Sequence, residues 1–248
     1  MKAFDMLMEA VFPSNIYCIC CGAVIDRSRP YALCDSCIEK FHWLGHRTCS
    51  KCGKILDEDY LHERCHDCRQ TEHVFDRGFT CAQYGLYERA VIMDYKYRDR
   101  SWIGKKLGDI LADRMRLEDI RYDIIIPVPI HASREKARGY NQASVMADRV
   151  GRITGHAVRK DVLVRSKATA PMKDLNISER AENLKGAFKV CRGREKDIAG
   201  KDILLIDDIY TTGATADSCC TVLKAGGAEK VYFLTFAAGG NVITGNRI

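Results

Sequence analysis

Two adjacent carboxylates at the end of an apolar run are the residues of this chain whose types and spacing most clearly indicate chemistry. Ile203–Ile206 has the character of a buried strand, and Asp207 and Asp208 follow it directly. A turn of small and hydroxyl-bearing residues comes next, and a helix is expected over Ala216–Ala225. The backbone N–H groups of such a turn and the positive end of the helix bind phosphate, and Gly213 allows a close approach. We therefore expect a site for a phosphorylated sugar; the alternative is an ordinary buried strand with a charged exit loop.

The segment Ile203–Thr215 resembles the 5-phosphoribosyl-1-pyrophosphate (PRPP) motif of type I phosphoribosyltransferases. The resemblance implies that the two carboxylates hold the ribose hydroxyls and that the turn holds the 5′-phosphate. It also implies that the loop after Pro127–Pro129 faces the pyrophosphate, which Arg138 could contact and which Mg²⁺ would accompany. The residues expected to bind PRPP are Asp207, Asp208, Thr211, Thr212, Gly213, Ala214, Thr215, Pro129 and Arg138, and the candidate catalytic residues among them are Asp207, Asp208 and Arg138.

A cysteine repeat is the second informative pattern. Each half contains two C-x2-C pairs with a glycine after the first pair. The first half begins at Cys18 and the second begins 31 residues later, at Cys49. Each pair can supply two of the four ligands of a tetrahedral zinc ion. We expect two structural zinc ions, one bound by Cys18, Cys21, Cys34 and Cys37 and one by Cys49, Cys52, Cys65 and Cys68, with this pairing favoured over cross-bracing. A disulfide framework is the alternative, and it requires an oxidising compartment.

The composition is that of a soluble protein rather than a membrane protein. Of the 248 residues, 46% are hydrophobic, and no apolar run approaches the length of a membrane span. The segment Met1–Phe12 carries two acids and no basic leader, so a short amphipathic helix is expected there, not a signal peptide. Thirteen cysteines without an export signal indicate metal binding in a reducing, cytoplasmic environment.

The charge is unevenly divided along the chain. The formal net charge is +6, but residues 1–75 contain nine Lys and Arg against eleven Asp and Glu, a net of −2, which leaves +8 for residues 76–248. Four thiolates around one Zn²⁺ add a charge of −2, so two such sites would bring the cysteine-rich region to about −6. The basic surface is therefore expected on the second part of the chain, which argues against the cysteine-rich region as the main surface for nucleic acid.

The remaining pattern predicts the elements that position these residues. Strands are expected near residues 79–85, 123–129, 161–165, 203–206 and 230–236, and helices near 87–97, 103–115, 142–153, 178–184 and 216–225. This alternation predicts an α/β fold with a parallel sheet and ligands at the carboxyl ends of its strands. We expect a helix and double zinc ribbon over residues 1–75 and a phosphoribosyltransferase-like domain over residues 76–248. Residues 167–177 are expected to form a loop that closes over PRPP, or else an ordinary charged surface loop.

The order of these segments resembles the ComF family, also called ComFC or GntX-like. The resemblance covers nearly the whole chain and rests on the zinc repeats, Lys96-Tyr97, Arg138–Gln142, Arg180–Phe188 and the acidic motif. One departure is Met172, because the family usually carries Gln after the proline equivalent to Pro171. The resemblance implies a cytoplasmic protein of natural competence that acts on incoming single-stranded DNA beside a ComFA-like helicase.

Two functions stay open from the sequence. The first is a PRPP-binding protein of the ComF type, acting in DNA uptake, with the ribbons as docking modules for a partner. The second is an active, Mg²⁺-dependent phosphoribosyltransferase of nucleotide salvage that transfers the phosphoribosyl group to an unidentified base or nucleophile. The side chains expected to contact single-stranded DNA are Arg134, Lys136, Arg138, Lys167 and Lys173, although Arg134 and Lys136 are equally well explained as solvated charges.

Overall fold

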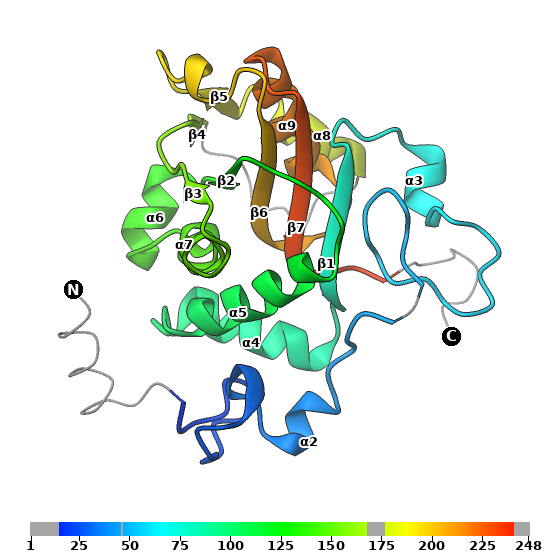
Figure 1. Cartoon of the computed structure of the whole chain (residues 1–248), viewed down its shortest axis with the longest axis vertical. Coiled ribbons are helices and arrows are strands. Elements are labelled where there is room, and N and C mark those ends of the chain that lie inside the picture. The colour runs from blue at the N-terminus through cyan, green and yellow to red at the C-terminus, as the bar shows by residue number, and fades with distance from the viewer. Residues whose placement is uncertain (1–14, 46, 168–176, 241–248) are drawn as a thin grey trace.

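A parallel five-stranded sheet forms the centre of the molecule (Figure 1). The computed structural model describes residues 15–45, 47–167 and 177–240. The strand order is β1–β7–β6–β2–β3, and all four pairings are parallel. The strands of this sheet are β1 (Arg77–Gln83), β2 (Ile124–Pro127), β3 (Ala157–Val158), β6 (Asp202–Tyr210) and β7 (Lys230–Ala238), and a separate antiparallel pair consists of β4 (Leu163–Arg165) and β5 (Phe188–Val190).

Helices cover both faces of the sheet. They are α2 (Asp35–Ile38), α3 (His66–Gln70), α4 (Leu86–Tyr97), α5 (Ile103–Arg116), α6 (Ala132–Arg138), α7 (Gln142–Thr154), α8 (Ile177–Leu184) and α9 (Ala214–Ala225), with 3-10 turns η1 (Pro30–Ala32) and η3 (Glu195–Asp197). Side chains alternate between the two faces along a strand. In β6, Leu204 and Ile206 pack with α4, α5 and α7, whereas Ile203 and Leu205 pack with α9. The run of apolar residues in β6 is thus explained by burial on both faces.

The two cysteine repeats form two small ribbons that belong to opposite faces of the sheet. The first ribbon, built around Cys18–Cys37, shares a hydrophobic cluster with α4 and α5, and the Tyr31 hydroxyl donates to Asp113 of α5 at 3.0 Å. The second ribbon, built around Cys49–Cys68, shares the other cluster with α9 and β7. In Figure 1 the blue segment lies below α4 and α5, and the cyan segment lies beside β1. Apolar packing is continuous across residue 75, so the division into domains at 75/76 stays a prediction.

Most elements expected from the sequence are present, with two differences near the proposed site. Strand β6 continues to Tyr210 instead of ending at Ile206, because it stays paired with β7 as far as Ala238. Arg134, Lys136 and Arg138 lie on α6, where the sequence predicted a loop. The predicted helix at Met1–Phe12, Met172, Lys173 and most of the predicted 167–177 loop lie outside the described residues.

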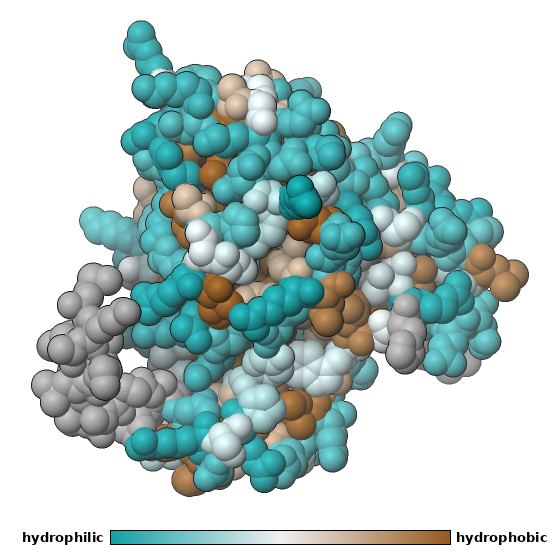
Figure 2. Space-filling model, in the orientation of Figure 1, coloured by the Kyte–Doolittle hydropathy of each residue, from teal (hydrophilic) through white to brown (hydrophobic). Residues whose placement is uncertain are grey.

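Within the described ranges, none of the helices combines the length and apolar character needed to cross a membrane. The face shown in Figure 2 is mostly hydrophilic, with apolar side chains interspersed among charged ones.

Candidate functional site

The acidic pair lies near the carboxyl end of the central strand β6. Asp207 and Asp208 are consecutive strand residues, so their side chains leave opposite faces of the sheet. Asp208 is directed to the α4 side, where its Oδ2 lies 2.6 Å from Lys96 Nζ in an ion pair whose side chains are 9% and 20% exposed. The backbone N–H of Asp208 donates to Asp207 Oδ1 at 2.8 Å. The sequence placed both carboxylates at this edge, and the structure adds a cation from α4.

Burial and mutual repulsion change the ionisation of this group of charges. Burial and the neighbouring Asp208 raise the pKa of Asp207 to about 7. Burial by itself would lower the pKa of Lys96, but the two aspartates raise it above its ordinary value. The cluster therefore contains a fixed cation and a carboxyl that titrates near neutral pH, which is a property of acid–base and ligand-binding sites.

The turn after β6 has the geometry of a phosphate-binding turn. Gly213 is the N-cap of α9 and has a φ of +86°, in the left-handed region that favours glycine. Ala214 and Thr215 belong to the first turn of this twelve-residue helix, so their N–H groups lie at the positive end of the helix dipole. The buried Thr212 hydroxyl has no hydrogen-bond partner among the described residues, while Thr211 is exposed. These donors are available to an anion.

The other predicted site residues, Pro129 and Arg138, come after β2, the strand next to β6. Pro129 follows β2 and lines a hollow of about 470 Å³ together with Tyr140, Asn141 and Arg165. Arg138 is not among the lining residues, and its guanidinium lies 5.4 Å from the ring centroid of Tyr97, directly after Lys96 in α4. Whether Arg138 reaches a pyrophosphate stays a prediction.

His131 is the N-cap residue of α6. Its Nδ1 accepts from the Ser133 N–H at 3.3 Å, at the beginning of α6. This contact favours a structural role for His131.

Three residues of this region were not predicted from local pattern. Lys96 entered only through the ComF resemblance, because no spacing rule connects a helix residue to a strand more than a hundred positions later. Arg165, at the end of β4, lies close enough to Asp207 to oppose the rise in its pKa. His73 is buried beneath the turn, within van der Waals reach of Gly213. Lone histidines and arginines in connecting segments give no signal of such placement.

The eight predicted metal ligands form two groups of four. Cys18, Cys21, Cys34 and Cys37 make one group and Cys49, Cys52, Cys65 and Cys68 the other, and the sulfur atoms of each group lie within 4.8 Å of one another. Gly22 and Gly53 follow the first pair of each ribbon with φ values of +75° and +74°, as expected for a tight turn. Four thiols gathered this closely fit tetrahedral zinc, one ion per ribbon. Cys20 is not part of either group.

Family models match both parts of the chain. A double zinc ribbon domain matches residues 7–69, and a phosphoribosyl transferase domain matches residues 136–242. "Competence protein F" of Haemophilus influenzae is 27% identical over 88% of this chain and 94% of that protein. "DNA utilization protein YhgH" of Escherichia coli O157:H7 is 29% identical over 74% of this chain and 80% of that protein. "Competence protein ComFC" of Bacillus subtilis is 24% identical over 82% of each chain. The chain therefore combines a double zinc ribbon domain with a phosphoribosyltransferase-type domain, and it is similar along most of its length to Competence protein F and ComFC.

Proposed function

We propose that this protein binds PRPP, or a closely related phosphoribosyl ligand, together with Mg²⁺ at the carboxyl edge of β6. The observation that supports this best is the sequence of groups along one short segment. Two carboxylates are followed by a Thr212 hydroxyl that has no hydrogen-bond partner in the described part of the chain, and by a glycine-capped helix N-terminus. Carboxylates suit ribose hydroxyls, and the turn suits a 5′-phosphate.

The ligand would be held by groups from three elements. Asp207 and Asp208 would accept hydrogen bonds from the ribose, and residues Thr211–Thr215 would donate to the phosphate. Lys96 neutralises Asp208 and keeps a positive charge beside the site. When bound, Mg²⁺ would offset the charge of the pyrophosphate. Pro129 and Arg138, on the neighbouring strand end and on α6, would lie on the pyrophosphate side.

We propose a biological role in DNA uptake or utilisation, as the names of the relatives suggest for those proteins. Single-stranded DNA and a ComFA-like helicase are the proposed partners, and the reducing cytoplasm is the proposed location. Exposed cations on α6 and at the end of β4, Lys136 and Lys167, lie on the basic part of the chain and would contact the DNA backbone.

A second candidate, phosphoribosyl transfer, is favoured by one specific observation. The pKa of Asp207, raised to about 7 by burial and by Asp208, suits a general base at neutral pH. In such a transfer the bond between ribose C1 and the pyrophosphate oxygen breaks, a bond from C1 to the acceptor nitrogen forms, and Asp207 would take the acceptor's proton. Pyrophosphate leaves with both electrons of the broken bond.

One experiment tests the binding proposal and separates it from the enzymatic alternative. The zinc-loaded protein is titrated with Mg²⁺–PRPP in a calorimeter, and it is then incubated with Mg²⁺–PRPP and a panel of bases and nucleotides while pyrophosphate release is followed. Saturable binding with no release supports a binding protein. Release that requires one acceptor supports the transferase. The proposed function is contradicted if the calorimeter detects no PRPP binding and the incubation releases no pyrophosphate.

A further inference from the structure

The segment between the second ribbon and β1 runs directly under the proposed phosphate turn. His73 in this segment has a fully buried side chain. Its Nδ1 lies 2.7 Å from Asp217 Oδ2 in the first part of α9, and its Nε2 lies 3.3 Å from the Tyr210 hydroxyl at the end of β6. A carboxylate only accepts, so His73 Nδ1 donates to Asp217, and Nε2 is left to hydrogen-bond with the Tyr210 hydroxyl. One imidazole thus connects the residues on both sides of the turn.

The turn is built in contact with this imidazole. A Cβ placed on Gly213 would lie 2.6 Å from His73 Cε1 and 2.7 Å from the Tyr210 hydroxyl. Gly213 is therefore required by the packing of the segment beneath the turn as well as by its own φ of +86°. The neighbouring Val74 N–H donates to Asp217 Oδ1 at 2.8 Å, so both oxygens of this carboxylate are held by the segment that leaves the second ribbon.

The other end of this arrangement reaches the second zinc site. The side chain of Lys54 is only 4% exposed, and its Nζ lies 2.6 Å from Asp67 Oδ2. Asp67 stands in the sequence between Cys65 and Cys68, two ligand positions of the second zinc site. The same Nζ lies 5.6 Å from the ring centroid of Tyr210.

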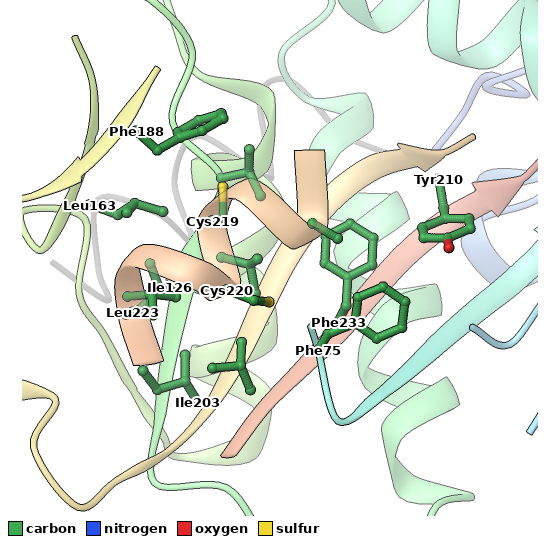
Figure 3. Close-up of a cluster of buried hydrophobic side chains, with 14 of the residues drawn as sticks. Phe75, Ile126, Leu163, Phe188, Ile203, Tyr210, Cys219, Cys220, Leu223 and Phe233 are labelled. Carbon is green, nitrogen blue, oxygen red and sulfur yellow. The ribbon is translucent and has the colours of Figure 1, made fainter. Parts of the chain in front are cut away.

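Aromatic packing joins the two ends. Phe75 is stacked on His73 with ring centroids 4.9 Å apart, and its ring centroid lies 6.1 Å from that of Tyr210 and 6.2 Å from that of Phe233. Figure 3 shows Phe75 and Phe233 next to α9, with Tyr210 on the side of these rings away from the helix. The zinc site, the aromatic group and the turn are thus parts of one packed unit.

We propose that the second ribbon supports the phosphate turn, that His73 is the positioning residue through which it does so, and that zinc in the second site strengthens binding of the phosphorylated ligand. The first ribbon packs on the opposite face of the sheet, against α5, and has no such role. The effect on ligand affinity rests on the proposed function, because it takes PRPP as the ligand of the turn. The mechanical coupling between the second ribbon and the turn does not depend on which ligand binds. Two energetically coupled sites affect each other equally, so PRPP should strengthen zinc binding by the factor by which zinc strengthens PRPP binding.

The first test needs no ligand and uses matched cysteines of the two repeats. Cys65→Ser removes a ligand of the second site, and Cys34→Ser removes the equivalent ligand of the first. Hydrogen exchange of the full-length protein should show about tenfold or faster exchange of amides 211–218 in Cys65→Ser and little change there in Cys34→Ser. Equal protection of residues 211–218 in both variants would overturn the coupling.

A second set of variants keeps the zinc site intact, in case Cys65→Ser does not fold. His73→Ala removes both hydrogen bonds of the imidazole, while His73→Asn retains a donor near the position of Nδ1. His62→Ala, at an exposed histidine of the same ribbon, is the control. Exchange of residues 211–218 should be fastest in His73→Ala, partly restored in His73→Asn and unchanged in His62→Ala. Unchanged exchange in His73→Ala overturns the role of this residue.

Calorimetry with Mg²⁺–PRPP then connects the support to the ligand. We expect His73→Ala to lower the affinity by roughly five- to fiftyfold, within the usual range of coupling between sites, and His62→Ala to leave it unchanged. Wild-type protein that does not bind PRPP would contradict the proposed function and leave the exchange experiment to decide the coupling. Wild-type protein that binds PRPP no better than His73→Ala would contradict the inference and leave the proposed function standing.

Discussion

Replacing Lys96 by methionine tests the electrostatics of the acidic pair. Lys96 Nζ lies 2.6 Å from Asp208 Oδ2, and both side chains are mostly buried. Removing one partner of a buried ion pair costs about 3–5 kcal/mol because the other charge is left uncompensated. Since both side chains keep some contact with water, we expect the lower end of that range, a fall of about 3 kcal/mol in the free energy of unfolding at pH 8.

The loss of unfolding free energy in Lys96→Met should depend on the charges of Asp208 and Asp207. In the double variant Lys96→Met/Asp208→Asn no charge of the pair is left alone, so most of the stability should return, with a coupling energy of about 2 kcal/mol. The loss should also shrink at pH 5. Burial and Asp208 raise the pKa of Asp207 to about 7, so at pH 5 this carboxyl is protonated and does not repel Asp208.

Urea unfolding of zinc-loaded protein, followed by far-ultraviolet circular dichroism at pH 5 and pH 8, measures these differences. Arg116→Met is the control, because the Arg116–Asp113 pair has a similar distance of 2.7 Å but side chains that are 61% and 43% exposed. Such an exposed pair is worth less than about 1 kcal/mol. If Lys96→Met were no more destabilising than Arg116→Met, or if the losses in the double variant simply added, the assignment of a buried, coupled charge cluster would be refuted.

Three further predictions concern metal, pH and nucleic acid. Elemental analysis should find two zinc ions per chain and one in Cys34→Ser, and one or none in the wild type would contradict the ribbon assignment. Because the pKa of Asp207 is raised from 3.8 to about 7 by burial and Asp208, the native state keeps a proton that the unfolded chain has released. The Asp207 contribution should therefore lower the free energy of unfolding as the pH rises from about 4 to about 7, and Asp207→Asn should remove this slope in urea titrations; an unchanged slope would count against the shift. Single-stranded DNA binding should weaken with salt, and Lys136→Ala and Lys167→Ala should each reduce the slope of log affinity against log salt by about 0.7 while Arg69→Ala in the second ribbon does not. A gel-shift titration in which Arg69→Ala has the larger effect would place the nucleic acid on the ribbon instead.

Much of the fold follows from sequence pattern because the relevant signals are local. The apolar run of β6, the small-residue turn and the cysteine spacing each occupy a few consecutive residues, and burial on both faces of the sheet makes the strands nearly continuous in hydrophobicity. Helix α6 was missed because its residues, Ala132–Arg138, bury no side chain and so leave no apolar periodicity.

The parts that could not be predicted depend on contacts between distant segments. The ion pair of Lys96 with Asp208 and the hydrogen bonds of His73 with Asp217 and Tyr210 exist only once the sheet is assembled. The placement of the ribbons is of the same kind, since both have the same cysteine pattern and yet pack on opposite faces. Gly213 was expected to allow a phosphate to approach the backbone, whereas the imidazole packed beneath it has no signature in the local sequence.

The measurement that tests the central claim most directly is calorimetric titration of wild type, Asp207→Asn and Asp208→Asn with Mg²⁺–PRPP. A charged hydrogen-bond acceptor removed from a ligand hydroxyl costs on the order of 1.5–3 kcal/mol, so each variant should lose roughly ten- to hundredfold in affinity. Circular dichroism and zinc content should be unchanged, which separates a lost ligand contact from a lost fold. Wild-type binding that both variants retain in full would contradict the assignment of the acidic pair as the ribose site.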